Sequence, residues 1–97
     1  MMNDILLIHV PSMHKMSEGN IPFPLGLMYV GGILERLGKN VKIHDLYLYD
    51  FPYEDRWGYL MLKKIIEDFS PDVIGYGGIA MSYGWAKNLS IQVKKDY

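Results

Sequence analysis

The sequence predicts an α/β fold in which three strand–helix units build a parallel sheet. Short apolar runs alternate along the chain with longer segments of helical periodicity, and the length of 97 residues suits one small domain. Strands that alternate with helices pair in parallel through right-handed crossovers. We therefore expect strands at residues 5–10, 41–46 and 72–76, and helices at residues 25–37, 56–69 and 82–95.

A long loop separates the first strand from the first helix. Ile5 to Val10 is an almost continuous apolar run, which is typical of a strand buried on both faces. Residues 11–24 contain three prolines and one glycine and show little periodicity. In the next segment the apolar residues recur at spacings of three and four, as on one face of a helix: Leu27, Val30, Leu34 and Leu37. Gly38 stands where this helix should end.

Two glycines interrupt the first helix. Gly31 and Gly32 each cost roughly 1 kcal/mol relative to alanine in a helix interior. We expect close packing of the helix on the sheet to be the reason, because the pair lies too far inside the helix to meet a ligand.

The second unit places a more polar strand before an amphipathic helix. Val41 and Ile43 alternate with Lys42 and His44, which indicates one wetter face and a position near the edge of the sheet. The buried stripe of the helix should consist of four residues: Leu62, Ile65, Ile66 and Phe69. Ser70-Pro71 then ends the helix.

The third unit begins with an apolar strand and a glycine turn. Asp72 to Tyr76 forms the strand, and Gly77-Gly78 makes the turn. Ser82 is the expected N-cap of the last helix, which turns Ala86, Leu89 and Val93 to one side.

The first and third strands are apolar enough to be central strands of a sheet. A sheet of only three strands would leave one of them at an edge, with unpaired backbone groups and exposed apolar surface. We therefore expect the chain to be the N-terminal part of a larger doubly wound sheet, or to have a partner that completes its sheet. A three-stranded mini-domain is the alternative.

The composition narrows the possible function. Ten basic and eleven acidic residues leave a net charge of -1, so nothing indicates a nucleic-acid partner. The chain has no cysteine, which excludes disulfides, thiolate zinc sites and iron–sulfur clusters bound by this segment. The apolar runs are too short to cross a bilayer, and no basic region precedes the first one. We expect a cytoplasmic protein.

Ligands of open parallel sheets bind beyond the carboxyl ends of the strands, where the strand order reverses. Three segments should meet there: residues 11–24, the residues from 44 onward, and residues 77–82. Neither a G-x-G-x-x-G turn nor a Walker P-loop occurs. The glycines at positions 75, 77 and 78 suit either a ligand that approaches the backbone or a turn of positive φ.

The three histidines have different expected roles. His9 lies in the first strand and should be a hydrogen-bonded core residue, whereas His14, in the loop, is either solvent-exposed or a metal ligand. His44 precedes Asp45, which either caps a loop or resembles the ribose-binding acid of dinucleotide folds. The tyrosines and Trp57 between Leu46 and Tyr59 either cover the sheet or stack on a ligand. No catalytic constellation assembles from these residues, so the segment itself should be a non-catalytic binding module.

The chain resembles the N-terminal cobalamin-binding domain of class B radical SAM enzymes. Three motifs carry this resemblance along almost the whole length: P-x-G-L-x-Y from Pro24, L-G-x-x-V-x-I-x-D from Leu37, and P-D-V-I-G from Pro71. The resemblance implies a Rossmann-like or flavodoxin-like sheet that holds cobalamin at the strand ends. It also implies a downstream or partner domain with a C-x-x-x-C-x-x-C iron–sulfur cluster that cleaves S-adenosylmethionine, for methyl transfer or radical rearrangement.

The resemblance also implies which residues lie near the corrinoid. The loop of residues 11–24 should lie near the corrin face, and residues 77–82 near the corrin or its nucleotide tail. The expected contacts are Pro11, Ser12, His14, Pro24, Gly26, Gly77, Gly78, Ile79 and Ser82. In the wider corrinoid family a D-x-H-x-x-G loop ligates cobalt; here Ser12 to Ser17 matches only at His14. His14 is therefore a candidate cobalt ligand that lacks the motif's aspartate and glycine.

Other functions of the same fold class remain open. A flavodoxin-like interaction or nucleotide-binding domain without corrinoid is the main alternative, although Ser12 and Ser17 give little of a phosphate loop. A receiver domain would need an acidic cluster at the end of the first strand and an aspartate at the end of the third. His9-Val10 and Tyr76-Gly77 occupy these positions instead. Half of a nucleotide-sugar-binding or glycosyltransferase domain is a third alternative.

Overall fold

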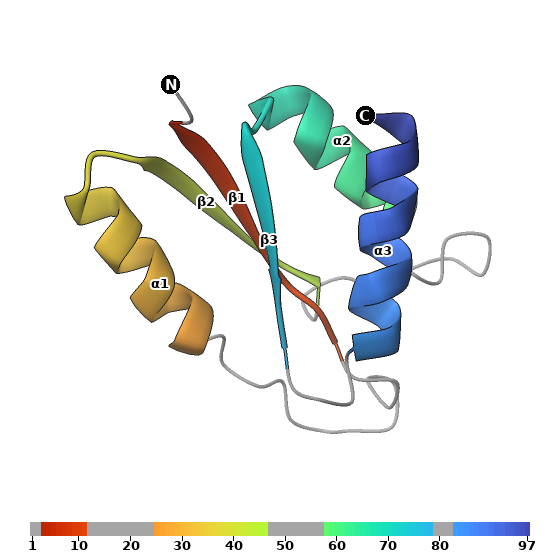
Figure 1. The fold of residues 1–97 in the computed structure, drawn as a ribbon, viewed down its shortest axis with the longest axis horizontal. Coiled ribbons are helices and arrows are strands. Elements are labelled where there is room, and N and C mark those ends of the chain that lie inside the picture. The colour runs from red at the N-terminus through yellow and green to blue at the C-terminus, as the bar shows by residue number, and fades with distance from the viewer. Residues whose placement is uncertain (1–2, 12–24, 47–57, 79–82) are drawn as a thin grey trace.

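The computed structural model describes residues 3–11, 25–46, 58–78 and 83–97. In chain order the elements are β1 (Asp4–His9), α1 (Leu25–Arg36), β2 (Asn40–Asp45), α2 (Tyr59–Phe69), β3 (Val73–Gly77) and α3 (Tyr83–Asp96). The strands form one parallel sheet in the order β2-β1-β3 (Figure 1). The predicted α/β class with three strand–helix units is confirmed, and the arrangement is Rossmann-like.

Helices lie on both faces of the sheet (Figure 1). α1 lies over β2 and β1 on one face, and α2 and α3 pack against the other face. The approach of α1 is close: a Cβ atom on Gly31 would lie 3.4 Å from Ile43 Cδ1, 3.5 Å from Val41 Cγ1 and 3.7 Å from Leu7 Cδ1. The predicted packing role is confirmed for Gly31. It is wrong for Gly32, which is exposed and has open space around it.

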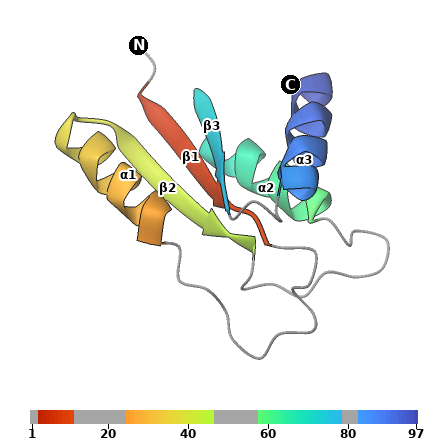
Figure 2. The same cartoon turned by 60° about the horizontal axis from the view of Figure 1, so that its bottom comes forward.

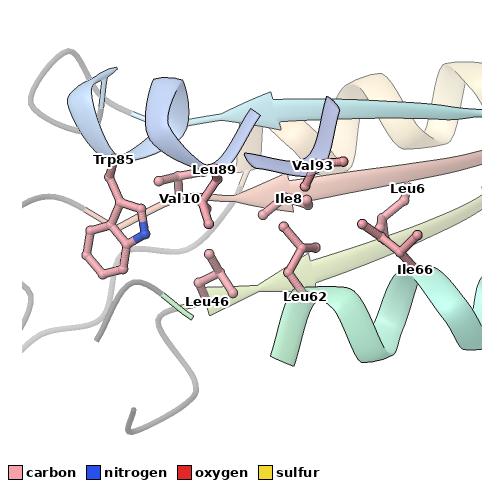
Figure 3. Close-up of a cluster of buried hydrophobic side chains, with 9 residues drawn as sticks. All are labelled: Leu6, Ile8, Val10, Leu46, Leu62, Ile66, Trp85, Leu89 and Val93. Atoms are coloured by element: carbon pink, nitrogen blue, oxygen red, sulfur yellow. The ribbon is translucent and has the colours of Figure 1, made fainter. Parts of the chain in front are cut away.

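The main core fills the space between the sheet and the two helices α2 and α3 (Figure 3). β1 supplies Leu6 and Ile8, both fully buried, and Val10 follows directly after the strand. The other members come from the end of β2 and from the two helices: Leu46, Leu62, Ile66, Trp85, Leu89 and Val93. Each buried side chain of this size contributes about 1.5–3 kcal/mol relative to an exposed one.

The strands differ in burial as their places in the sheet require. β1 is central, and its apolar residues are buried on both faces, as predicted. β2 is an edge strand with the exposed Lys42 on it, also as predicted. β3 is apolar like a central strand, yet it forms the other edge of the described sheet, and 38% of Val73 is exposed.

Left-handed residues mark the helix ends. Gly38 follows α1 with φ 85°, and Lys39 N–H donates to Leu34 O at 3.0 Å, which closes the helix where the sequence predicts. Ser70 ends α2 with φ 50° and donates its N–H to Ile66 O at 2.8 Å. α2 begins at Tyr59, after Gly58 with φ 74°, rather than at residue 56. Ser82, the expected cap of α3, lies outside the described residues.

The stripe expected on α1 is only partly covered. Leu27 and Leu34 are half-buried, whereas Val30 and Leu37 are exposed. α1 is rich in apolar residues, and it is 12 residues long. None of the helices in the described part of the chain is long and apolar enough to cross a membrane.

Candidate functional site

The strand order reverses between β1 and β3, which makes the carboxyl ends of these strands the expected ligand site. We call this end of the sheet the carboxyl edge; the strands end there at His9, Asp45 and Gly77. α1 and α3 both begin on this side of the molecule (Figure 2). Backbone pairing with β3 extends one residue beyond β1, because Val10 N–H donates to Gly77 O at 2.8 Å.

A histidine–aspartate pair joins the ends of β1 and β2. His9 and Asp45 are register partners, and His9 Nδ1 lies 3.0 Å from Asp45 Oδ1. Both side chains are nearly buried, each with 10% of its surface exposed. The carboxylate can only accept, so the pair favours the tautomer in which His9 carries its proton on Nδ1. The prediction that His9 is a hydrogen-bonded core residue is confirmed.

Gly77 completes this row of residues across the sheet. It is the register partner of His9 on β3, and a Cβ atom there would lie 2.7 Å from Leu27 Cδ2, closer than real atoms approach. Gly77 is therefore a glycine because the first turn of α1 packs on it. Of the two reasons that the sequence offered, a positive φ does not apply at Gly77, and contact with a ligand stays a prediction.

The other expected contacts fall into three groups. Pro11 is buried directly after β1. Gly26, in the first turn of α1, is exposed with no atom within 4 Å of a Cβ position, and Gly78 is also exposed. The remaining expected contacts lie outside the described residues: Ser12, His14, Pro24, Ile79 and Ser82.

His44 lies on the face of the sheet opposite to Asp45. It is buried among the residues that face α2, between Lys42 and Leu46 along the same side of β2. Burial lowers the pKa of its imidazole below the usual 6.5, and the positive charge of Lys42 lowers it further, against the opposing effect of Asp45. At neutral pH this ring is uncharged, so it is a core residue and not an exposed ligand.

Two features of the site were missed in the sequence. Trp85 is buried beside Val10 at the carboxyl end of the core (Figure 3). Its position four residues before Leu89 could have indicated that both lie on the buried face of α3. The contact between Leu27 and Gly77 joins residues 50 positions apart, and no local pattern indicates it. Within the described ranges, no group of three or more histidine, cysteine, aspartate or glutamate side chains could hold a metal ion.

A cleft of about 890 Å³ lies away from the carboxyl edge, between α2, α3 and the start of β3. Its lining includes Glu67, Asp72, Tyr76, Lys94 and Tyr97, and Tyr97 Oη donates to Glu67 Oε1 across it at 3.2 Å. Burial raises the pKa of the Tyr76 phenol, so this group stays neutral. The cleft is open and sits at the amino ends of the strands, where the fold does not place its ligands.

Comparisons of this chain with models of protein families, with curated proteins and with solved structures found no match. What is established is the fold: a parallel α/β sheet of order 2-1-3 with its reversal point between β1 and β3.

Proposed function

We propose that this chain is a corrinoid-binding module that holds cobalamin at the carboxyl edge. The observation that carries the proposal is the 2-1-3 strand order, because ligands of such sheets bind at the reversal point and the resemblance implies the cofactor at the same strand ends. The resemblance to the cobalamin-binding domain of class B radical SAM enzymes supplies the ligand class.

The described residues fit a flat, bulky ligand at two positions. Gly26 and Gly78 present backbone without side chains, both are exposed, and the space above Gly26 is open. Pro11 is buried and Leu27 fills the space over Gly77, so neither adds to this exposed surface. The pair of His9 and Asp45 joins the ends of β1 and β2 at this edge.

In this proposal the module binds and orients the cofactor and performs no reaction itself. Bound cobalamin supplies methyl-transfer or radical chemistry through its cobalt. The chain has no cysteine, so an iron–sulfur cluster that cleaves S-adenosylmethionine belongs to another domain or chain. The proposed setting is the cytoplasm.

A visible-absorption titration with hydroxocobalamin, followed by gel filtration, tests the proposal. The informative variant is Gly26→Leu, which puts a side chain over the proposed site at an exposed helical position. Gly32→Leu is the matched control, because Gly32 is equally open on the same helix but lies almost two turns from the carboxyl edge.

We expect the wild-type chain and Gly32→Leu to retain the corrinoid and Gly26→Leu to bind it roughly tenfold more weakly or worse. A His14→Ala variant with an unchanged bound spectrum would remove His14 from the coordination of cobalt. If the wild-type chain retains no corrinoid but binds flavin mononucleotide, the flavodoxin-like alternative replaces the proposal.

A further inference from the structure

Space, and not backbone conformation, requires a glycine at position 77. The φ angle of Gly77 is not positive, so a residue with a side chain could adopt the same backbone. A Cβ atom on Gly77 would lie 2.7 Å from Leu27 Cδ2, 3.0 Å from Leu27 Cγ and 3.3 Å from Leu27 Cδ1. Because the whole branched end of the leucine lies against the strand, a turn of one methyl group would not make room for a larger residue.

Gly75 lies two positions earlier on the same strand and has a different kind of neighbour. A Cβ atom there would lie 2.9 Å from one methyl carbon, Leu7 Cδ2, and within 4 Å of no other atom among the described residues. Leu7 belongs to β1, the paired neighbour of β3, so this contact stays within the sheet. The contact at Gly77 instead joins β3 to a helix.

Leu27 and Gly31 hold α1 on the sheet at two points. They are four positions apart and therefore lie one turn apart on the same face of the helix. Gly31 lies over side chains of β2 and β1, whereas Leu27 lies over the end of β3. Since α1 begins only two residues before Leu27, this second contact sets the place of the first helical turn.

Gly26 precedes Leu27 in this first turn. It is exposed, with no atom within 4 Å of a Cβ position, and the proposed function puts it against the corrinoid. We propose that Gly77 is a positioning residue of the corrinoid site that acts through Leu27. The missing side chain lets Leu27 pack on β3 and thereby holds Gly26 at the carboxyl edge. The ligand in this inference rests on the proposed function, but the contact does not.

Titration with hydroxocobalamin tests the effect on the ligand. Gly77→Ala should displace Leu27 and raise the dissociation constant of the corrinoid by roughly tenfold. Gly75→Ala is the matched control, because it adds the same methyl group to the same strand against Leu7 and should leave this constant unchanged. The double variant Gly77→Ala/Leu27→Ala should recover most of the lost affinity, since the shorter side chain vacates the space that the new methyl group needs.

Hydrogen exchange of the chain without cobalamin measures the position of the first turn directly. The amides of residues 29–32 bond to the carbonyl groups of that turn. They should exchange roughly tenfold faster in Gly77→Ala than in the wild-type chain or in Gly75→Ala.

The two measurements separate this inference from the proposed function. A wild-type chain that retains no corrinoid removes the proposed function, and hydrogen exchange then decides the positioning role alone. Unchanged exchange in Gly77→Ala would overturn the inference. Equal losses of affinity in the two alanine variants, or no recovery in the double variant, would overturn it as well.

Discussion

His44 shows how one buried ring ties the stability of the protein to pH. The imidazole is only 4% exposed, and burial followed by the charge of Lys42 lowers its pKa below 6.5 in the folded state. The unfolded chain restores the ordinary value, so between the two values the unfolded state binds more protons than the folded state. The stabilising contribution of the neutral ring is complete above pH 6.5 and is lost as the pH falls through the folded pKa.

We therefore expect the free energy of unfolding, measured by urea titration, to fall from pH 7.5 to pH 5 in part because of His44. Each unit of pKa difference corresponds to about 1.4 kcal/mol of linked stability. A His44→Gln variant should show a smaller fall over the same interval. An equal pH dependence of wild type and His44→Gln would contradict the assignment.

At the same scale, the side chain of Leu27 lies in the space beside Gly77 that a larger residue would fill. An added Cβ at Gly77 would lie 2.7 Å from Leu27 Cδ2, so the glycine leaves room for this helix side chain. This contact places the start of α1 over the end of β3 and thereby shapes the proposed ligand site.

At the scale of elements, α1 differs from the helices on the other face. α2 and α3 each contribute buried residues to the core, whereas α1 approaches the sheet through Gly31 and leaves much of its surface exposed. The absence of a side chain at Gly31 lets the helix axis come close to Val41 and Ile43. The neighbouring Gly32 has no such partner, so it costs helix propensity without a compensating contact.

This difference predicts opposite effects of one substitution at two adjacent positions. Gly31→Leu forces the new side chain against Val41, Ile43 and Leu7 and should destabilise the protein by about 1–3 kcal/mol. Gly32→Leu should stabilise it by up to about 1 kcal/mol, through helix propensity alone. Thermal or urea unfolding of the pair measures both. Equal destabilisation by the two variants would show that α1 does not pack as described.

At the scale of the whole molecule, the layer of α2 and α3 and the central strand hold most of the core. β1 lies between two parallel neighbours, and its apolar side chains serve both faces of the sheet. β3 and α1 are more exposed than this layer: Val73 is 38% exposed, and Val30 and Ile33 are 47% and 57% exposed.

The burial of a side chain in this fold should decide how much its truncation lowers the free energy of unfolding. Ile8→Ala removes a fully buried side chain from the central strand and should lower the free energy of unfolding by about 2–5 kcal/mol. Ile91→Ala removes the same side chain at a site 56% exposed on α3 and should change it by less than about 0.5 kcal/mol. Comparable losses in urea unfolding would mean that the core is not centred on β1.

The local elements of this fold were predictable because each rests on a short-range pattern. The run from Ile5 to Ile8 indicated a strand buried on both faces, and Gly38 and Ser70-Pro71 indicated helix ends, within a few residues of their observed places. His9 as a core residue followed from its place in the first strand. The partner of its ring did not, because Asp45 is 36 positions away.

The sequence by itself determined the alternation of strands and helices and the parallel pairing. These follow from periodicity and from the handedness of crossovers, which act along the chain. Only the tertiary structure decided that β3 lies at an edge of the described sheet, that Gly31 packs while Gly32 does not, and that Leu27 occupies the space over Gly77. These outcomes depend on which distant side chains compete for the same volume, and no local pattern records that competition.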